Sequence, residues 1–357
     1  MASSELLSGS QNGRGACTMT TVLEALNQAM HEAMQRDDRV IFLGEDILDP
    51  YGGAFKFAQG LSTRFPDRVF TTPISEAAII GIASGLALRG LRPVAEIMFG
   101  DFLGLAFDQL LNHACKFREM YNQQVRVPMV VRTPMGGRRG YGPTHSQSIE
   151  KHFLGIPGLR VVAPNSVTNP KQLLLDCIFA SEDPTLFIEH KLLYATRLKP
   201  STEIPKLDLV ATGSHFPNVT IRVAGAPTPS VTVATYGYSA ELALEALWRM
   251  AVEQEVFIEL LIPTQLNPLD SNPLLESVRK TRRLVTLEEG GTSFGWGSEV
   301  VSKAVEAGLV ACTRVGAWDC CIPSSRPLEA TVLPSVQDVC DAIAQVLVPD
   351  GACEPVL

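Results

Sequence analysis

Hydrophobic positions in the first half of the chain alternate between two patterns, one typical of helices and the other of buried strands. Residues 19–37 place apolar side chains at helical spacing, and residues 39–46 follow as a short apolar run that ends in polar residues. The alternation continues through the segment PTLFIEH at residues 184–190. Strands that alternate with helices predict a parallel sheet covered on both faces.

The pattern breaks down from about residue 198 to 229, where prolines, glycines and short extended pieces predict a domain connector. A second series of alternating strands and helices follows it. We therefore expect an α/β protein with two doubly wound domains in tandem. The predicted division is a flexible tail at 1–17, a first domain at 18–200, a linker at 201–228 and a second domain at 229–350.

One predicted helix, at residues 75–89, is apolar on almost every side, and Ser75 is expected to be its N-cap. A helix that is apolar all round is buried, and its small residues allow close packing. Glu76 lies in its first turn, where the helix dipole alone would favour a carboxylate. A carboxyl group at the mouth of a buried helix is nevertheless costly unless something pairs with it. A ligand nitrogen is the functional alternative.

The composition argues against several classes of protein. The 357 residues are 46% hydrophobic and 19% charged, as in an ordinary globular protein. A formal net charge of -8 and a pI near 5.4 argue against nucleic acid or an acidic membrane surface as the main partner. No apolar run reaches about 18 residues, so no membrane span is expected. The tail has no apolar signal region and the cysteines lack C-x-x-C spacing, which predicts reduced thiols in a cytoplasm.

Three further side chains are candidates for a site. Met98 and Phe102 follow a predicted strand, and such apolar residues either fill the core or line the ligand crevice at the carboxyl end of a parallel strand. His145 lies in a loop with glycines at 136, 137, 140 and 142. A lone loop histidine is more often a structural hydrogen-bonding group. Glycines that let the backbone come close to a ligand favour a functional role, as does the acid–base chemistry of imidazole.

A series of motifs occurs along the chain in this order: GED, TPISEAAIIGIASGLALRG, AEIMFGDFLGLAFDQ, THSQS, PGLRVVAPNS, PTLFIEHKLLY, VTVATYG, NPLD, VTLEEGGTSFGWGSEV, RVGAWDCCIP and PLEATVLPS. In this order they resemble the β subunit of 2-oxoacid dehydrogenase E1 components, which belongs to the transketolase-like thiamine-diphosphate family. The resemblance covers roughly residues 19–348 and predicts a pyrimidine-binding domain followed by a transketolase C-terminal-like domain.

The resemblance implies a role for each candidate. Glu76 would hydrogen-bond N1′ of the cofactor's aminopyrimidine ring and so activate the cofactor for attack on a 2-oxo group. Phe102 would stack on the pyrimidine, and Met98 would lie near the same ring. His145 would assist the covalent intermediate or the acyl acceptor.

The family holds Mg²⁺ and the diphosphate with a GDG motif, which this chain lacks. The motif lies on the α subunit, so the resemblance implies an α2β2 heterotetramer that shares thiamine diphosphate and Mg²⁺ between unlike subunits. No side chain of this chain is expected to bind the metal. The family often holds a structural K⁺ through backbone carbonyls, and the sequence leaves that ion open. The acyl acceptor would be a lipoyl domain of the E2 component.

The sequence departs from the family in the segment that should shape the donor pocket. Gly155 replaces a histidine of the family, and His152 stands where an aromatic residue often lines the substrate side. A more polar pocket would suit a hydroxylated donor; the alternative is that His152 points elsewhere. The segment LLIPTQLNP at 260–268 and the last ten residues also depart from the pattern, and both bear on docking of the acyltransferase.

Three interpretations stay open, and a fourth is disfavoured. The first is an oxidative-decarboxylase subunit that delivers acyl groups to lipoyl domains. The second moves a two-carbon unit from an oxoacid or a ketose to an acyl-carrier protein. The third is a non-catalytic scaffold that completes a heteromer. A nucleotide-binding oxidoreductase is disfavoured, because no G-x-G-x-x-G follows the first strand.

Overall fold

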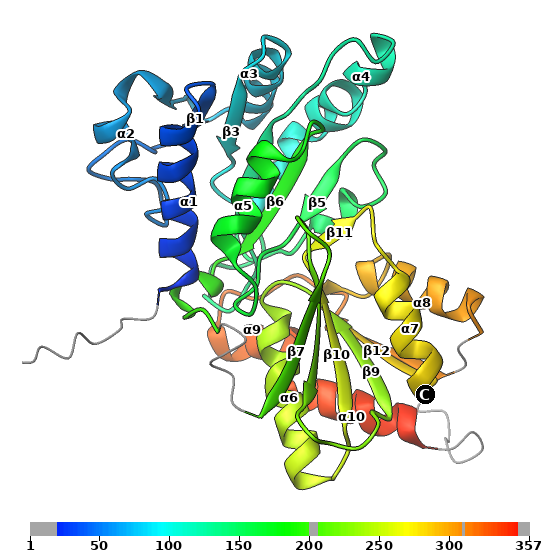
Figure 1. Cartoon of the computed structure of the whole chain (residues 1–357). Coiled ribbons are helices and arrows are strands. Elements are labelled where there is room, and N and C mark those ends of the chain that lie inside the picture. Colours follow the sequence, from blue (N-terminus) through cyan, green and yellow to red (C-terminus); the bar gives the residue numbers. More distant parts are fainter. Residues whose placement is uncertain (1–19, 200–205, 309–310, 349–357) are drawn as a thin grey trace, which may run out of the picture.

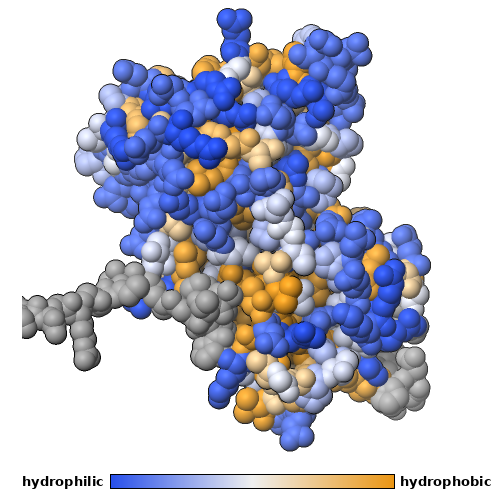
Figure 2. Space-filling view, in the orientation of Figure 1, coloured by the Kyte–Doolittle hydropathy of each residue, from blue (hydrophilic) through white to orange (hydrophobic). Residues whose placement is uncertain are grey.

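The computed structural model describes residues 20–199, 206–308 and 311–348, which form two α/β units, one above the other in Figure 1. This arrangement confirms the predicted fold class. The predicted tail at 1–17 lies outside the described residues. On the face seen in Figure 2, hydrophilic residues cover most of the upper unit, and apolar residues gather over the middle of the lower one.

The first unit is built on a seven-stranded sheet. Its strands, in spatial order, are β11 (Gln265–Asn267), β5 (Arg160–Val162), β6 (Thr185–His190), β4 (Val130–Met135), β3 (Arg92–Glu96), β1 (Val40–Gly44) and β2 (Val69–Thr71). Its helices are α1 (Val22–Arg36), α2 (Leu61–Arg64), α3 (Glu76–Leu88), α4 (Phe117–Met120) and α5 (Pro170–Phe179).

The second unit is built on a six-stranded sheet. Its strands, in spatial order, are β13 (Ala311–Ala317), β12 (Arg283–Gly291), β9 (Val231–Thr235), β10 (Ile258–Pro263), β8 (Asn218–Val223) and β7 (Leu207–Thr212). Its helices are α6 (Ser239–Glu253), α7 (Asn272–Thr281), α8 (Trp296–Glu306), α9 (Arg326–Val332) and α10 (Val336–Leu347). None of the helices in the described ranges combines the length and the hydrophobicity that a membrane crossing requires.

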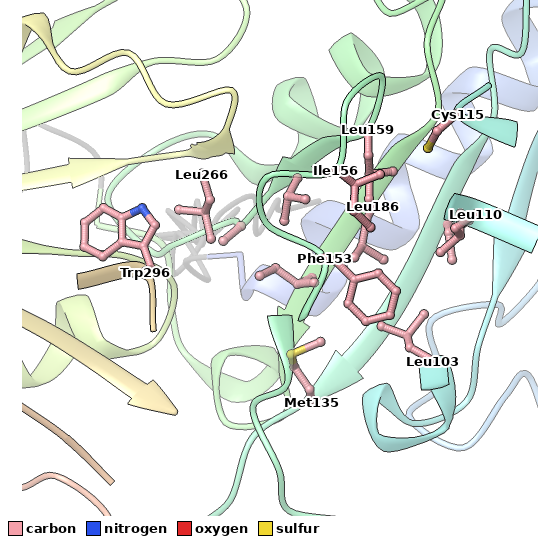
Figure 3. Close-up of a cluster of buried hydrophobic side chains, with 14 of the residues drawn as sticks. Leu103, Leu110, Cys115, Met135, Phe153, Ile156, Leu159, Leu186, Leu266 and Trp296 are labelled. Atoms are coloured by element: carbon pink, nitrogen blue, oxygen red, sulfur yellow. The ribbon is translucent and has the colours of Figure 1, made fainter. Parts of the chain in front are cut away.

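The two faces of the first sheet have separate cores, because successive side chains of a strand point to opposite faces. On β6, Phe187 packs into the cluster that contains α1 and α5, whereas Leu186 packs into the cluster beneath α3. The second of these clusters does not stop at the domain boundary. It continues through Leu266 to Trp296 of the second unit (Figure 3), so the two units share one core.

Both sheets are mixed rather than wholly parallel, and one difference falls in the predicted linker at 201–228. Strands β7 and β8 lie there and pair with each other as antiparallel neighbours at the edge of the second sheet. A hairpin needs only two short extended pieces joined by a turn, and the same sequence features predict a connector. Strand β11, which follows β10 of the second unit, crosses to pair with β5 of the first.

Apolar residues at helical spacing also predict a helix at residues 103–120, but the structure has no single regular helix there. The chain there forms a 3₁₀ segment (Gly100–Ala106), a π-helical segment (Gln109–Ala114) and then α4. Helical spacing of apolar residues does not distinguish these tighter and wider turns from a regular α-helix.

A buried arginine joins three neighbouring strands of the first sheet near their carboxyl ends. Arg132 of β4 is 1% exposed and forms a two-pronged pair with Glu189 of β6, with both N–O distances at 2.7 Å. It also donates to Glu96 of β3 and, at 2.7 Å, to the hydroxyl of Tyr194. The guanidinium lies 3.8 Å from the centre of the Phe57 ring. Such a pair is stable only because each charge has its partner.

We predict that Arg132→Met lowers the free energy of unfolding by about 3–5 kcal/mol, because it leaves two carboxylates buried without their cation. Urea unfolding of the purified chain measures this. The matched control is Arg249→Met on the exposed side of α6, which should change stability by less than about 0.5 kcal/mol. Equal losses in the two variants would contradict a structural role for the buried network.

Candidate active site

The candidate residues gather at one edge of the first sheet, where its parallel strands end. Glu45 directly follows β1, Met98 follows β3, and the loop that carries His145 follows β4. Strands β1, β3 and β4 are parallel neighbours. The carboxyl ends of such strands meet at the same edge, which is where open α/β sheets bind ligands.

Glu76 is the first residue of α3, with Ser75 in the N-cap position as predicted. The residue as a whole is 5% exposed, and within the described residues its side chain accepts no hydrogen bond. The Ser75 side chain forms no cap hydrogen bond either. The helix dipole is thus the only favourable interaction from this end of the helix. A buried carboxylate in this state can take a hydrogen-bond donor from a ligand.

A second buried carboxylate, Glu45, was not among the candidates from the sequence. Its side chain is buried, and its Oε1 atom has no hydrogen-bond partner in the described part of the chain. Burial and then the nearby charge of Glu76 raise the pKa of Glu45 to about 6. The signal in the sequence was its place after a buried strand. The sequence could not show that Glu76 lies close enough to raise the pKa of Glu45.

His145 and Phe102 are brought together. The imidazole of His145 lies edge-on to the rings of Phe99 and Phe102, with centroid distances of 4.9 and 5.2 Å. Phe102 belongs to the 3₁₀ segment that packs against α3, the helix of Glu76. Met98 is half-buried beside Phe99. The edge therefore combines two acidic groups, an imidazole and aromatic faces.

Lys191 is a further residue that the sequence did not single out. It is fully buried and donates a hydrogen bond to the backbone carbonyl of His145. Its ammonium group lies 5.3 Å from the centre of the Phe99 ring and 5.4 Å from that of Tyr141. Burial lowers the pKa of Lys191 to about 8. A lysine beneath the aromatic cluster thus fixes the backbone at His145.

The glycines of the loop approach the second unit of the same chain. A side chain at Gly136 would collide with His190 of the first unit and Glu289 of the second, and one at Gly137 would collide with Leu333. Gly140 and Gly142 lie against Ser324 and have left-handed φ angles of +73° and +79°. The expectation that these glycines admit a ligand has no support in these contacts. They let the loop pack closely against the second domain.

His152, which the sequence predicts on the substrate side of the donor pocket, lies between the two units. Its side chain is exposed and lines a groove of about 460 Å³ between the two units. Cys320 and Cys321 line the same groove, and Lys151 beside them donates to the carbonyl of Ser293 at 2.8 Å. A role of His152 in the donor pocket stays a prediction.

The edge suits one half of the implied cofactor. An aminopyrimidine can donate hydrogen bonds to carboxylates from its amino group and from a ring nitrogen that carries a proton, and it offers a flat face to an aromatic ring. Glu76, Glu45 and Phe102 supply those groups. The described residues contain no group of three or more histidine, cysteine, aspartate or glutamate side chains placed to hold a metal ion.

Comparison with known families finds two domain families in this chain. Residues 18–196 match the transketolase pyrimidine-binding domain, and residues 222–339 match the transketolase C-terminal domain. Among solved structures, the chain is similar to one described as a split-gene transketolase, inactive β4 tetramer. The TM-score is 0.70 at 22% identity, over 92% of this chain and 98% of the other, which establishes likeness of fold.

Curated relatives are more similar in sequence. A pyruvate dehydrogenase E1 component subunit β from Rickettsia conorii is 36% identical, over 91% of this chain and 98% of the relative. The mitochondrial subunit of the same name from Caenorhabditis elegans is 36% identical, over 94% of each chain. The β subunit of acetoin:2,6-dichlorophenolindophenol oxidoreductase from Cupriavidus necator is 35% identical, over 89% of this chain and 94% of the relative.

The raised pKa of Glu45 predicts a pH-dependent stability. Between pH 4.5 and about 6 the folded chain holds a proton that the unfolded chain releases. This contribution is fully present below pH 4.5 and is lost as the pH rises through about 6. Glu45→Gln removes it, so the stability of the variant relative to the wild type should increase across that window.

Urea unfolding at a series of pH values measures this difference. The exposed Glu276→Gln is the matched control and should follow the wild type at every pH. If Glu45→Gln also follows the wild type, Glu45 does not titrate as its surroundings require.

Proposed function

Because this chain belongs to the family of E1 component β subunits of the pyruvate dehydrogenase type, we propose that it activates thiamine diphosphate for decarboxylation of a 2-oxoacid such as pyruvate. When bound, this cofactor supplies the carbon nucleophile and the electron sink of the reaction. The observation that carries the proposal is the buried carboxylate of Glu76, at the first turn of α3, with no protein partner among the described residues.

The proposal gives each residue of the edge a task. Glu76 accepts a hydrogen bond from N1′ of the aminopyrimidine, which favours the tautomer that can take up a proton. Phe102 packs on the face of that ring, and Met98 contacts its border. Burial and the nearby charge of Glu76 raise the pKa of Glu45 to about 6, so the two acidic side chains lie close together. Each task needs only a short-range contact at the edge already described.

His145 is the proposed acid–base group of the second half-reaction. Its Nδ1 atom lies 3.1 Å from Oγ1 of Thr144, and its ring is held edge-on by Phe99 and Phe102. This leaves Nε2 as the nitrogen that can face a reacting group. An imidazole held in this way can give or take a proton near neutral pH.

The partner that we propose is an α-type subunit, in a heterotetramer that shares the cofactor and Mg²⁺. A part of the surface next to Glu76 is apolar and open. Ile74 is 82% exposed, Ile82 is 53% exposed and Leu105 is 62% exposed. A side-chain carbon added at Gly81 or Gly85 of the same helix would meet no other atom within 4 Å. Exposed apolar side chains that gather in one patch often mark a protein–protein interface.

The acyl acceptor is proposed to be a thiol on a lipoyl domain or on a carrier protein. The alternative with a ketose or hydroxylated donor and an acyl-carrier protein rests on the departures at His152 and Gly155. A structural K⁺ in the first domain, held by backbone carbonyls, is a further part of the proposal. Release of CO₂ from pyruvate, as against consumption of a ketose phosphate, separates the two donors.

The first test replaces Glu76 with Gln in the chain co-expressed with an α-type subunit. Turnover of the 2-oxoacid should fall by at least about a hundredfold, since a positioned acid–base group contributes on the order of 10²–10⁴. The assembly of the complex, which size-exclusion chromatography measures, should not change. An assembled complex with unchanged turnover would favour a scaffold without catalytic function. The exposed Glu306→Gln serves as control.

The second test concerns the shared cofactor site. The chain purified alone should bind thiamine diphosphate weakly at any Mg²⁺ concentration, because its described residues offer no metal-binding cluster. Isothermal titration calorimetry with and without Mg²⁺ measures this. Tight, Mg²⁺-dependent binding by the isolated chain would contradict the need for an α-type partner.

A further inference from the structure

The loop at residues 136–148, called here the His145 loop, is held by two carboxylates of the second domain. Glu289, near the end of β12, accepts a hydrogen bond from the backbone N–H of Gly137 at 2.7 Å. Glu329 of α9 accepts from the N–H of Arg138 at 2.7 Å with one oxygen, and from the N–H of Gly140 at 2.8 Å with the other. Three backbone donors of the loop therefore point at acids that lie more than 150 residues away in the sequence.

Glu329 makes the more informative of these contacts. Its side chain is 1% exposed, so its charge is removed from water and depends on its hydrogen bonds. Arg138 and Gly140 present their N–H groups because both have left-handed φ angles, +70° and +73°. Arg138 is not a glycine, so this conformation is strained for it. The strain persists because both oxygens of one carboxylate bind there.

Glu289 supports the same segment from the other side. It accepts from Nε of Arg138 at 3.0 Å and lies 2.9 Å from Nε2 of His190. Burial alone would raise its pKa, but the charge of His190, the Arg138 guanidinium and the N–H of Gly137 together lower the pKa to about 2. Arg138 also donates to the carbonyl of Pro334 at 2.5 Å. The backbone N–H groups in the middle of the loop are thus held by the second domain, while the side chain of Arg139 donates to the carbonyl of Lys191 in the first domain at 3.2 Å.

Groups of the first domain hold the other end of the loop. The backbone carbonyl of His145 accepts from Lys191, and the N–H of Gln147 donates to Asp101, next to Phe102, at 3.1 Å. His145 lies between these two kinds of anchor. A shift of the loop at Arg138 and Gly140 would be passed along only a few residues before it reached the imidazole.

From this geometry we infer that Glu329 is a positioning residue for His145. Through Glu329, the second domain fixes the position of the imidazole at the carboxyl edge of the first sheet. The effect on turnover that this inference predicts rests on the proposed function. The position of the loop can be measured without assuming that function. Glu329 touches neither substrate nor cofactor, and it acts through the backbone of the loop.

Glu329→Gln tests this with the smallest change of shape. The amide oxygen can still accept from one N–H, but the amide nitrogen then faces the other, and that hydrogen bond is lost. In the complex with the α-type subunit, kcat should fall about tenfold to a hundredfold, since a misplacement of about 1 Å can cost on the order of 10²-fold. KM for the 2-oxoacid should stay within about twofold, because ground-state binding is untouched.

A double-mutant cycle with His145→Ala separates positioning from general loss of structure. If Glu329 acts through the imidazole, Glu329→Gln should lower the remaining turnover of His145→Ala by less than about twofold. The same fold loss in both backgrounds would overturn the inference. So would unchanged kcat in the single variant. Glu306→Gln, on the exposed side of α8, is the matched control and should change neither constant.

A second readout does not depend on turnover. In the assembled complex, deuterium exchange of the peptide that spans residues 136–148 should be faster in Glu329→Gln than in Glu306→Gln, and peptides of β4 and β6 should be unchanged. Unchanged exchange in 136–148 would overturn the inference. If Glu329→Gln does not fold, Glu329→Asp, which keeps the charge on a shorter stem, takes its place with the same two outcomes.

The two proposals can fail separately. A wild-type complex that does not turn over any 2-oxoacid would contradict the proposed function, and the exchange measurement would still decide whether Glu329 holds the loop. Normal wild-type turnover with equal fold losses in the cycle would contradict the positioning role alone.

Discussion

A carboxylate that is removed from water must find a partner, and most of the buried acids in this chain have found one. Glu96 and Glu189 share Arg132, Glu289 has His190 and Arg138, and Glu329 has two backbone N–H groups. These pairs join strands to each other and the second domain to the first. Glu76 and Glu45 differ from these acids, because neither side chain forms a hydrogen bond or an ion pair within the described residues. An enzyme can keep unpaired buried acids where a bound ligand supplies the missing hydrogen-bond donor.

The rest of the site follows from where the chain places those two acids. Parallel strands bring the ends of β1, β3 and β4 to one edge, and α3 begins there with Glu76 in its first turn. The His145 loop crosses the same edge and is held from beneath by Lys191 and from the side by the second domain. Apolar packing that runs from Leu103 to Trp296 keeps the two domains in a fixed relation (Figure 3). A site of this kind needs both domains in place.

The sequence predicted the α/β class, the order of the two domains and the family, because periodicity and ordered motifs are local signals. It predicted the helix that starts at Glu76 for the same reason. It did not predict the hairpin β7–β8 within the expected linker or the crossing of β11 to the first sheet, since pairing with distant strands leaves little local trace. The sequence could not show that the glycines of the His145 loop pack against Leu333 and Ser324 of the second domain, because only the fold brings these residues together. Glu45, Lys191 and Glu329 became visible for the same reason.

Everything proposed for this edge depends on whether the carboxylate of Glu76 activates a bound cofactor. The rate at which the C2 proton of thiamine diphosphate exchanges with deuterium reports on that step. Quenched-flow proton NMR can follow it in the complex with the α-type subunit. We expect exchange to be fast in the wild type and slower by at least about a hundredfold in Glu76→Gln, with cofactor still bound. Equal exchange rates in the two proteins would contradict this role of Glu76.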